Sequence, residues 1–218
     1  ELFRKISDEY GGQSQNNYQA LIQEIKDSGK GACIVSFNYD NLLEQNLGKE
    51  PTNMNTYITP PIRVIKVHGS CIWRYQLDLD PASEMTNAVT NSYEFLTKNP
   101  NYITTEQKFR LSIGRKDHET INGAGAYYYP AIALPFPGKK DFICPQEHIS
   151  ELQHALKQMQ KLLIIGWRAG DHHLIEMIED NVTQPVSVTV VTGGNTSAET
   201  IFQNLNHISN LTLSARCV

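Results

Sequence analysis

The sequence predicts an α/β protein in which helices cover both faces of a parallel sheet. Short runs rich in Val, Ile and Leu alternate along the chain with amphipathic segments of helical period, a pattern typical of parallel sheets. These runs are continuously apolar, as strands buried on both faces are. Several of them end in Gly, Asn or Asp, residue types that favour turns between elements.

In the first third of the chain, two strands and two helices are expected. Apolar residues at helical spacing predict a helix through Tyr18 and Ile25 that ends at a glycine-containing turn. The β-branched run at 32–37 predicts a buried strand, and a short helix follows at 42–47. The run at 62–67 predicts a second strand.

The pattern is irregular from about residue 71 to 129, where we expect a small, mostly helical insertion. Helices are predicted around 93–96 and 106–111, and regularity returns with a strand at 130–135 that has proline at both edges. The sequence Gly123-Ala-Gly-Ala126 is interpreted as a loop. We expect one domain over residues 1–218 that contains this insertion.

The last third alternates regularly between helix and strand. The predicted elements lie at residues 149–162, 162–165, 174–178, 186–191, 201–205 and 211–213. Asp171 is predicted to cap the helix through Leu174. Thr196-Ser-Ala-Glu199 is interpreted as a capping box for the helix through Ile201. The complete pattern predicts a Rossmann-like parallel sheet.

Composition excludes several classes of function. The 218 residues are 40% hydrophobic and 19% charged, an ordinary globular balance. A net charge of −4 provides no basic field for nucleic acid or an anionic membrane. Apolar runs such as 162–167 are far shorter than the roughly 20 residues that cross a bilayer. We therefore expect a cytoplasmic protein with no direct nucleic-acid partner and no membrane partner.

The cysteines do not predict a metal centre. No C-x-x-C pair occurs among Cys33, Cys71, Cys144 and Cys217, so zinc bound by paired cysteines is excluded and no metal is expected. Cys33 lies in an apolar run, which predicts a buried thiol. His172 and His173 beside Asp171 suggest a metal, but adjacent helical residues point apart and no third ligand is evident.

Polar groups follow three of the predicted strands. They are Asn38-Tyr39-Asp40, His68-Gly69-Ser70 and the segment 166–171. Ligands of open parallel sheets bind beyond the carboxyl ends of the strands, so these groups together form a candidate pocket. Taken singly, each group is also explained by turn and cap formation. His68 could be a strand-end histidine bonded to the backbone, Asp40 could cap the helix at Leu42, and Asp171 could act only as a cap.

Four blocks of the sequence resemble sirtuins, in the form found in bacterial sirtuin-like domains. VSFNYDNLLE at 35–44 resembles the N-x-D signature, and VIKVHGSCIW at 64–73 resembles the K-x-H-G-S-x-x-W block. The stretch 130–135, followed by Lys139, is similar to the P-x-I-x-x-P stretch. LLIIGWRAGD at 162–171 resembles the block with hydrophobic-G-Y-S-x-x-D. The blocks occur in family order and cover roughly residues 32–192.

The chain departs from the sirtuin pattern in three places. No strand followed by a G-A-G-x-S turn, which cradles the NAD diphosphate, precedes Asn38. Because this turn is missing, we expect either that the first βα unit lies upstream of Glu1 in a longer chain or that the chain is compromised for NAD. The four-cysteine zinc ribbon of protein-deacylating sirtuins is missing. Arg168 stands where a small hydroxyl residue is usual.

The resemblance implies an NAD⁺ glycohydrolase domain of bacterial anti-phage defence, with NAD⁺ as substrate and nicotinamide and ADP-ribose as products. It implies that His68 is the base, whose ordinary pKa near 6.5 suits that role, and that Asn38 orients the ribose or the water. Asp40 is placed at the nicotinamide pocket. The full nucleotide-binding set is expected to be Asn38, Asp40, Gly69, Gly166, Arg168, Asp171 and Gly193.

Other functions and partners remain open at this point. The alternative is a non-catalytic sensor or assembly module that binds NAD or ADP-ribose, and a protein deacylase is disfavoured by the missing zinc ribbon. Expected partners are NAD⁺ or ADP-ribose, together with further copies of the chain or a partner defence protein or domain.

Overall fold

The structure is a computed structural model that describes residues 17–48, 51–77, 109–111, 118–121, 124–133 and 142–217. The chain divides into two compact units, Glu1–Ile149 and Ser150–Val218. Both units contain parallel strands that alternate with helices, so the predicted α/β class is confirmed. The expectation of a single domain stays a prediction.

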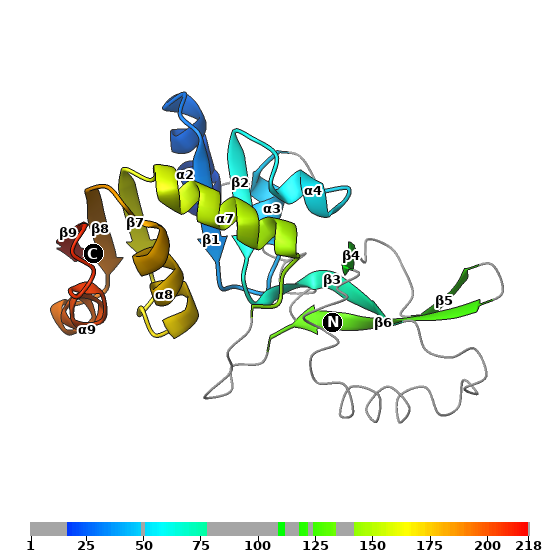
Figure 1. Cartoon of the computed structure of the whole chain (residues 1–218). Helices are drawn as coiled ribbons and strands as arrows, with labels where there is room; N and C mark the ends of the chain where they lie inside the picture. The colour runs from blue at the N-terminus through cyan, green and yellow to red at the C-terminus, as the bar shows by residue number, and fades with distance from the viewer. Residues whose placement is uncertain are drawn as a thin grey trace. The chain divides into compact units, whose positions relative to one another are not determined.

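The first unit begins with a helix and a parallel pair of strands. Its elements are, in chain order, α2 (Asn17–Asp27), β1 (Ala32–Ser36), α3 (Leu42–Asn46), α4 (Met54–Tyr57) and β2 (Ile62–Lys66). β1 and β2 pair in parallel, with Ser36 opposite Lys66 (Figure 1). These elements confirm the helices and strands predicted here. β1 is half-buried along its length, so Cys33 is half-buried and not fully buried as predicted.

An antiparallel sheet follows β2. It consists of β3 (Gly69–Leu77), β4 (Phe109–Leu111), β5 (His118–Ile121) and β6 (Ala124–Ile132), in the order β4-β3-β6-β5. The prediction of a mostly helical insertion is therefore wrong for the described residues of this segment. Residues 109–111 form β4 instead of a helix, and Gly125 and Ala126 lie in β6 instead of a loop. The helix predicted at 93–96 lies outside the described residues.

The pairing of β3 with distant segments explains this error. β3 meets β6 with Tyr75 opposite Tyr129 and meets β4 with Trp73 opposite Leu111. Backbone hydrogen bonds between distant segments leave no periodic pattern in either segment alone. Strand β6 also begins earlier than predicted and ends at Ile132.

Aromatic side chains form much of the core of the first unit. Trp73 is fully buried, and its ring meets Tyr57 at 5.2 Å and Phe109 at 5.7 Å, both edge to face. This geometry is the favoured one for aromatic pairs. It makes Trp73 a packing residue that connects α4 with β3 and β4.

The second unit contains a three-stranded parallel sheet. Helix α7 (Gln146–Gln158) begins in the first unit and ends in the second, followed by β7 (Lys161–Ile165), α8 (His172–Asn181), β8 (Val186–Thr192), α9 (Asn195–Leu205) and β9 (Leu211–Cys217). The strand order is β7-β8-β9, and α9 packs against β8 and β9 (Figure 1). Fully buried Val188 and Val190 alternate with more exposed residues along β8.

The two predicted caps of this unit have different outcomes. The Asp171 carboxylate accepts a hydrogen bond from the Leu174 backbone N–H at 3.1 Å, which confirms it as the cap of α8. The capping box at 196–199 is wrong, because α9 begins at Asn195 with Gly194 as its N-cap. The Thr192 hydroxyl accepts from the Gly194 N–H at 3.0 Å, so the chain enters the helix before Thr196. Among the described helices, none is long and apolar enough to cross a bilayer.

Candidate functional site

Two of the predicted polar segments meet at one edge of the parallel pair. Asn38 and Asp40 follow β1, and His68 and Gly69 follow β2. Because Ser36 lies opposite Lys66 in a parallel ladder, both segments leave the strands at the same end. The Cys71 backbone N–H then donates to the Tyr39 carbonyl at 2.7 Å, which fastens the two segments together.

His68 contacts two aromatic rings. The Phe37 ring meets the imidazole edge to face at 5.2 Å between centroids, and the Tyr39 ring stacks at 6.5 Å. The His68 carbonyl accepts from the Ala133 backbone N–H at 2.8 Å, and the Tyr39 hydroxyl donates to the Ala133 carbonyl. The imidazole is half-buried, so it has a defined setting and still reaches solvent.

The side chain of Asn38 is exposed and oriented by a tyrosine. Its Nδ2 donates to the Tyr18 hydroxyl of α2 at 3.1 Å, and its backbone N–H donates to Ser36 Oγ at 3.3 Å. Burial raises the pKa of Tyr18, opposed by the hydrogen bond to Asn38, so the phenol remains protonated near neutral pH. Within the described residues, Asn38 Oδ1 accepts no hydrogen bond and is available to a ligand.

Asp40 combines a cap with a contact to a buried lysine. Its Oδ1 accepts a hydrogen bond from the Leu42 backbone N–H at 3.1 Å. The Asp40 side chain therefore caps the start of α3, which is one of the two roles considered for it in the sequence. Its carbonyl accepts from the Lys66 ammonium. Lys66 Nζ also lies 3.1 Å from Glu44 Oε1, and the hydroxyl of Tyr57 donates to that same oxygen at 3.1 Å.

This group of four residues, Asp40, Glu44, Tyr57 and Lys66, is here named the lysine network. Glu44 and Lys66 are 2% and 0% exposed, so neither charge is screened by water. Burial and the nearby Glu44 carboxylate raise the pKa of Tyr57 well above its usual value. Tyr57 therefore remains a hydrogen-bond donor to Glu44 throughout the physiological pH range.

Gly69 is required by packing at the start of β3. Its φ is +80°, and a Cβ there would lie 1.8 Å from the carbonyl oxygen of Ala131 in β6. The glycine thus permits close contact between two strands, a structural role that stands beside its predicted role in nucleotide binding.

The remaining predicted residues lie in the second unit, after β7 and β8. Ile165 pairs with Val191, so Gly166 and Gly193 leave the sheet at the same edge. The turn after β7 contains two left-handed residues, Gly166 at φ +70° and Ala169 at φ +51°. A Cβ added to Gly166 or to Gly193 would have no other atom within 4 Å, so there is open space beside the backbone at both positions.

An asparagine of α9 fastens this turn. Asn204 Nδ2 donates to the Ala169 carbonyl at 2.9 Å and to the Arg168 carbonyl at 3.4 Å. Arg168 is exposed, which makes its guanidinium accessible to an anion. Asp171 is partly buried and its carboxylate accepts from Leu174, as described above.

The structure thus places the eight predicted residues in two sets at two sheet edges. Asn38, Asp40, His68 and Gly69 are in the first unit, and Gly166, Arg168, Asp171 and Gly193 are in the second. Sequence reasoning assigned no role to Tyr18, Glu44, Tyr57, Lys66 and Asn204. A lysine within the apolar run at 62–67 was the available signal, because a lysine buried in a strand requires a partner.

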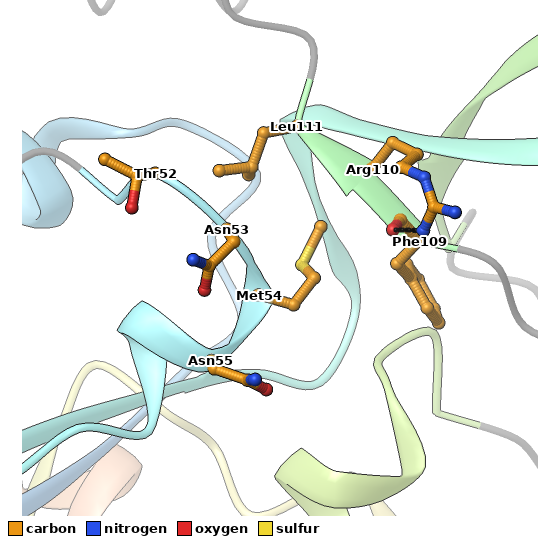
Figure 2. Close-up of a pocket in the computed structure, with 7 residues that line it drawn as sticks. All are labelled: Thr52, Asn53, Met54, Asn55, Phe109, Arg110 and Leu111. Atoms are coloured by element: carbon orange, nitrogen blue, oxygen red, sulfur yellow. Dashed lines mark hydrogen bonds between the residues drawn. The ribbon is translucent and has the colours of Figure 1, made fainter.

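One cavity in the described part of the first unit lies elsewhere. It measures about 460 Å³. Figure 2 shows that residues 52–55 border it on one side and Phe109, Arg110 and Leu111 of β4 on the other. Arg110 Nη1 donates to the Phe109 carbonyl at 2.9 Å. None of the predicted site residues lines this cavity.

Within the described ranges, no group of three or more His, Cys, Asp or Glu side chains is placed to hold a metal ion. His173 Nδ1 lies 4.0 Å from Glu176, its partner one helical turn along α8. His148 is fully buried, and one ring nitrogen lies 2.9 Å from the Met54 carbonyl.

Comparisons with known proteins give structural similarities only. No protein-family model and no curated protein matches the chain. Similar solved structures include Sir2Tm bound to a propionylated peptide, at 14% identity and a TM-score of 0.46 over 90% of this chain and 63% of that one. Sir2 bound to an acetylated peptide has 14% identity and a TM-score of 0.49, over 91% and 65% of the two chains.

A mutant Sir2 homologue in complex with ADP-ribose has 11% identity and a TM-score of 0.49, over 95% of this chain and 72% of that one. The chain therefore spans less than two thirds of the length of the first two structures. With TM-scores below 0.5, these similarities carry no conclusion about activity.

Proposed function

We propose that the protein hydrolyses NAD⁺ to nicotinamide and ADP-ribose, with His68 as the base and Asn38 as the residue that orients ribose or water. The observation that supports the proposal is that the segments carrying Asn38 and His68 leave the β1–β2 pair at the same end and are joined by the bond from Cys71 to Tyr39. The two residues come from separate blocks of the sequence that resemble sirtuin motifs.

The proposed reaction is a substitution at C1′ of the nicotinamide ribose. The bond between C1′ and the pyridinium nitrogen breaks, and its electron pair neutralises that nitrogen, so nicotinamide leaves without needing a proton. A water oxygen forms the new bond to C1′, and the water proton passes to an imidazole nitrogen of His68. The products are nicotinamide, ADP-ribose and one proton that His68 releases to solvent.

Each residue of the first set has a role that its setting supports. The half-buried imidazole of His68 contacts the rings of Phe37 and Tyr39 and is still accessible to water. Because Tyr18 holds Nδ2 of Asn38, Oδ1 of Asn38 is the atom that accepts from a ribose hydroxyl or the attacking water. The Asp40 carboxylate, which accepts from Leu42, is assigned to the nicotinamide pocket on the sequence resemblance.

We propose separately that the second set of residues, within its own unit, binds a nucleotide. Gly166 and Gly193 leave open space beside the backbone at one edge of their sheet, which suits a close approach by a ribose or phosphate. The exposed Arg168 would supply a cation for the diphosphate. Asp171 would remain the cap of α8 beside the bound nucleotide.

The proposal is tested by incubating the purified protein with NAD⁺ and measuring nicotinamide by chromatography. Removal of a positioned base typically costs about 10²–10⁴ in rate, so His68→Ala is expected to lose that much of kcat. Asn38→Ala is expected to show a comparable loss. His207→Ala, which changes an exposed histidine of the second unit, is the matched control and is expected to retain wild-type turnover.

A His68→Ala variant that retains full turnover would refute the mechanism. Release of nicotinamide that requires an acyl-lysine peptide would instead indicate a deacylase.

A second candidate function is a sensor that binds NAD⁺ or ADP-ribose without turnover. The observation that favours it is the placement of Gly125 and Ala126 in β6, because this Gly-containing segment is then not a phosphate-binding turn. Calorimetry decides between the two functions. Binding of NAD⁺ by wild type with no nicotinamide released over hours supports the sensor.

We place this activity in bacterial anti-phage defence, on the strength of the sequence resemblance and in association with further copies of the chain or a partner protein. The test is to express the complete gene product in bacteria, challenge them with phage and measure cellular NAD⁺. Depletion of NAD⁺ in wild-type cells, absent with His68→Ala, is expected. Equal NAD⁺ in both strains together with equal survival would contradict the role.

A further inference from the structure

Lys66 makes two kinds of contact from a fully buried position. One is ionic, to the Glu44 carboxylate at 3.1 Å and 3.4 Å. The other is to the backbone carbonyl of Asp40, in the turn that carries Asn38 and Tyr39. Lys66 is therefore the member of the lysine network that connects the buried charge pair with the candidate site.

The buried Glu44 carboxylate has the additional hydrogen bond that a buried ion pair requires. Glu44 accepts from Tyr57 as well as from Lys66, so its carboxylate has more than one donor. The Tyr57 ring is itself held against Trp73 in the core. A pair of apolar side chains could fill this space with less desolvation cost, but could not hold a carbonyl.

The backbone of the turn held by Lys66 is also held from the start of β3. The Tyr39 carbonyl accepts from the Cys71 N–H, and Ser70 Oγ lies 3.5 Å from it. The Asp40 carbonyl accepts instead from Lys66. The two carbonyls on consecutive residues are thus held by β2 and by the start of β3, which also carry His68 between them.

We propose that Lys66 is a positioning residue, which sets the turn 38–40 relative to His68 through the Asp40 carbonyl while Glu44, itself bonded to Tyr57, holds its ammonium. This inference rests on the proposed function for its effect on turnover. Its structural part, the fastening of the turn, does not depend on that function.

The test compares two variants that share one change. Glu44→Gln removes the carboxylate charge, keeps a side-chain oxygen for Tyr57 and retains Lys66. The double variant Glu44→Gln with Lys66→Met removes in addition the donor to Asp40 and leaves no unpaired buried charge. The two variants differ only at Lys66, so the comparison measures what its ammonium contributes through the Asp40 carbonyl and the side chain at position 44 together.

For turnover of NAD⁺, Glu44→Gln is expected to retain kcat within about threefold. The double variant is expected to lose about 10- to 100-fold in kcat, the scale of a misplacement near 1 Å, with KM changed less than threefold. A merely structural role would reduce the folded fraction of both variants and leave the kcat of the folded fraction unchanged. Equal kcat in the two variants overturns the inference, and so does failure of the double variant to fold by circular dichroism.

Hydrogen exchange provides the readout that does not depend on activity. The amides of Leu42 and Cys71 donate to Asp40 and Tyr39 of the turn. Both amides are expected to exchange at least tenfold faster in the double variant than in Glu44→Gln. If wild type shows no turnover, the proposed function fails and this exchange ratio still decides the positioning role, with a ratio of one overturning it.

Discussion

Replacing Gly69 by alanine distinguishes a glycine that the fold requires from one that only permits a nucleotide to approach. A Cβ on Gly69 would lie 1.8 Å from the Ala131 carbonyl oxygen and 2.8 Å from its carbonyl carbon. To reach 3.0 Å the oxygen must move by about 1.2 Å, and overpacking of this kind shifts backbone. Ala131 belongs to β6, so this shift disturbs the β3–β6 pairing.

The expected loss of stability has two parts. An alanine with φ near +80° costs about 1–2 kcal/mol, and the overpacking adds about 1–3 kcal/mol. The sum, roughly 2–5 kcal/mol, is a large fraction of the 5–15 kcal/mol that stabilises a typical protein. Gly166→Ala is a matched control, because Gly166 has a similar φ of +70° and a Cβ added there would have no other atom within 4 Å. It should lose only about 1–2 kcal/mol.

Urea unfolding followed by tryptophan fluorescence measures both losses. The chain contains two tryptophans, Trp73 in the first unit and Trp167 in the second. A Trp167→Phe background reports the first unit through the fully buried Trp73, and Trp73→Phe reports the second. Reading each unit separately avoids a two-state assumption over the whole chain.

Equal losses for Gly69→Ala and Gly166→Ala would refute the steric argument. A Gly69→Ala variant of wild-type stability that no longer binds NAD⁺ would instead assign this glycine to the nucleotide. In either case the comparison shows whether reduced turnover of a Gly69 variant reports binding or folding.

Three further predictions concern single side chains of the first unit. Tyr18→Phe removes the acceptor of Asn38 Nδ2, so kcat for NAD⁺ should fall by about 3- to 10-fold, the scale of one net hydrogen bond, and an unchanged kcat would contradict the orienting role. Burial lowers the pKa of His148 in the folded state below its ordinary value, so the unfolded chain takes up the proton first and stability should fall as pH drops below about 6.5. Thermal unfolding from about pH 7.5 to 5 should therefore show a smaller loss for His148→Gln than for wild type, and parallel curves would argue against it. Burial raises the pKa of Cys144 to about 12, so iodoacetamide at about pH 8 should label this thiol only after unfolding in urea, and rapid labelling of native protein, read by peptide mass spectrometry, would disprove its burial.

The local sequence pattern was sufficient to predict those helices and strands whose apolar residues line one face. The helix through Tyr18 and the strands at 32–37 and 62–67 were predictable because their apolar residues recur with the period of the element. Asp171 was predictable as a cap because a cap acts on a neighbour in sequence, here Leu174. Thr196 was misleading, since Thr192 and Gly194 begin the helix earlier.

One topological rule predicts part of the candidate site from the sequence. Residues that follow parallel strands meet at the carboxyl edge, and Asn38 and His68 do so after β1 and β2. The rule says nothing about side chains inside the sheet. The apolar run around Lys66 indicates that it needs a partner, but only the structure identifies that partner as Glu44, because Glu44 lies 22 residues earlier in the chain.

The sequence by itself determined the α/β class, the order of most helices and strands, and the polar segments at their ends, because each of these depends on the period and type of neighbouring residues. Only the tertiary structure decided that Gly69 faces the backbone of Ala131, that Tyr18 holds the amide of Asn38 and that Lys66 holds the turn beside His68. Each of these contacts joins residues far apart in the chain, and its strength depends on burial that no local pattern encodes.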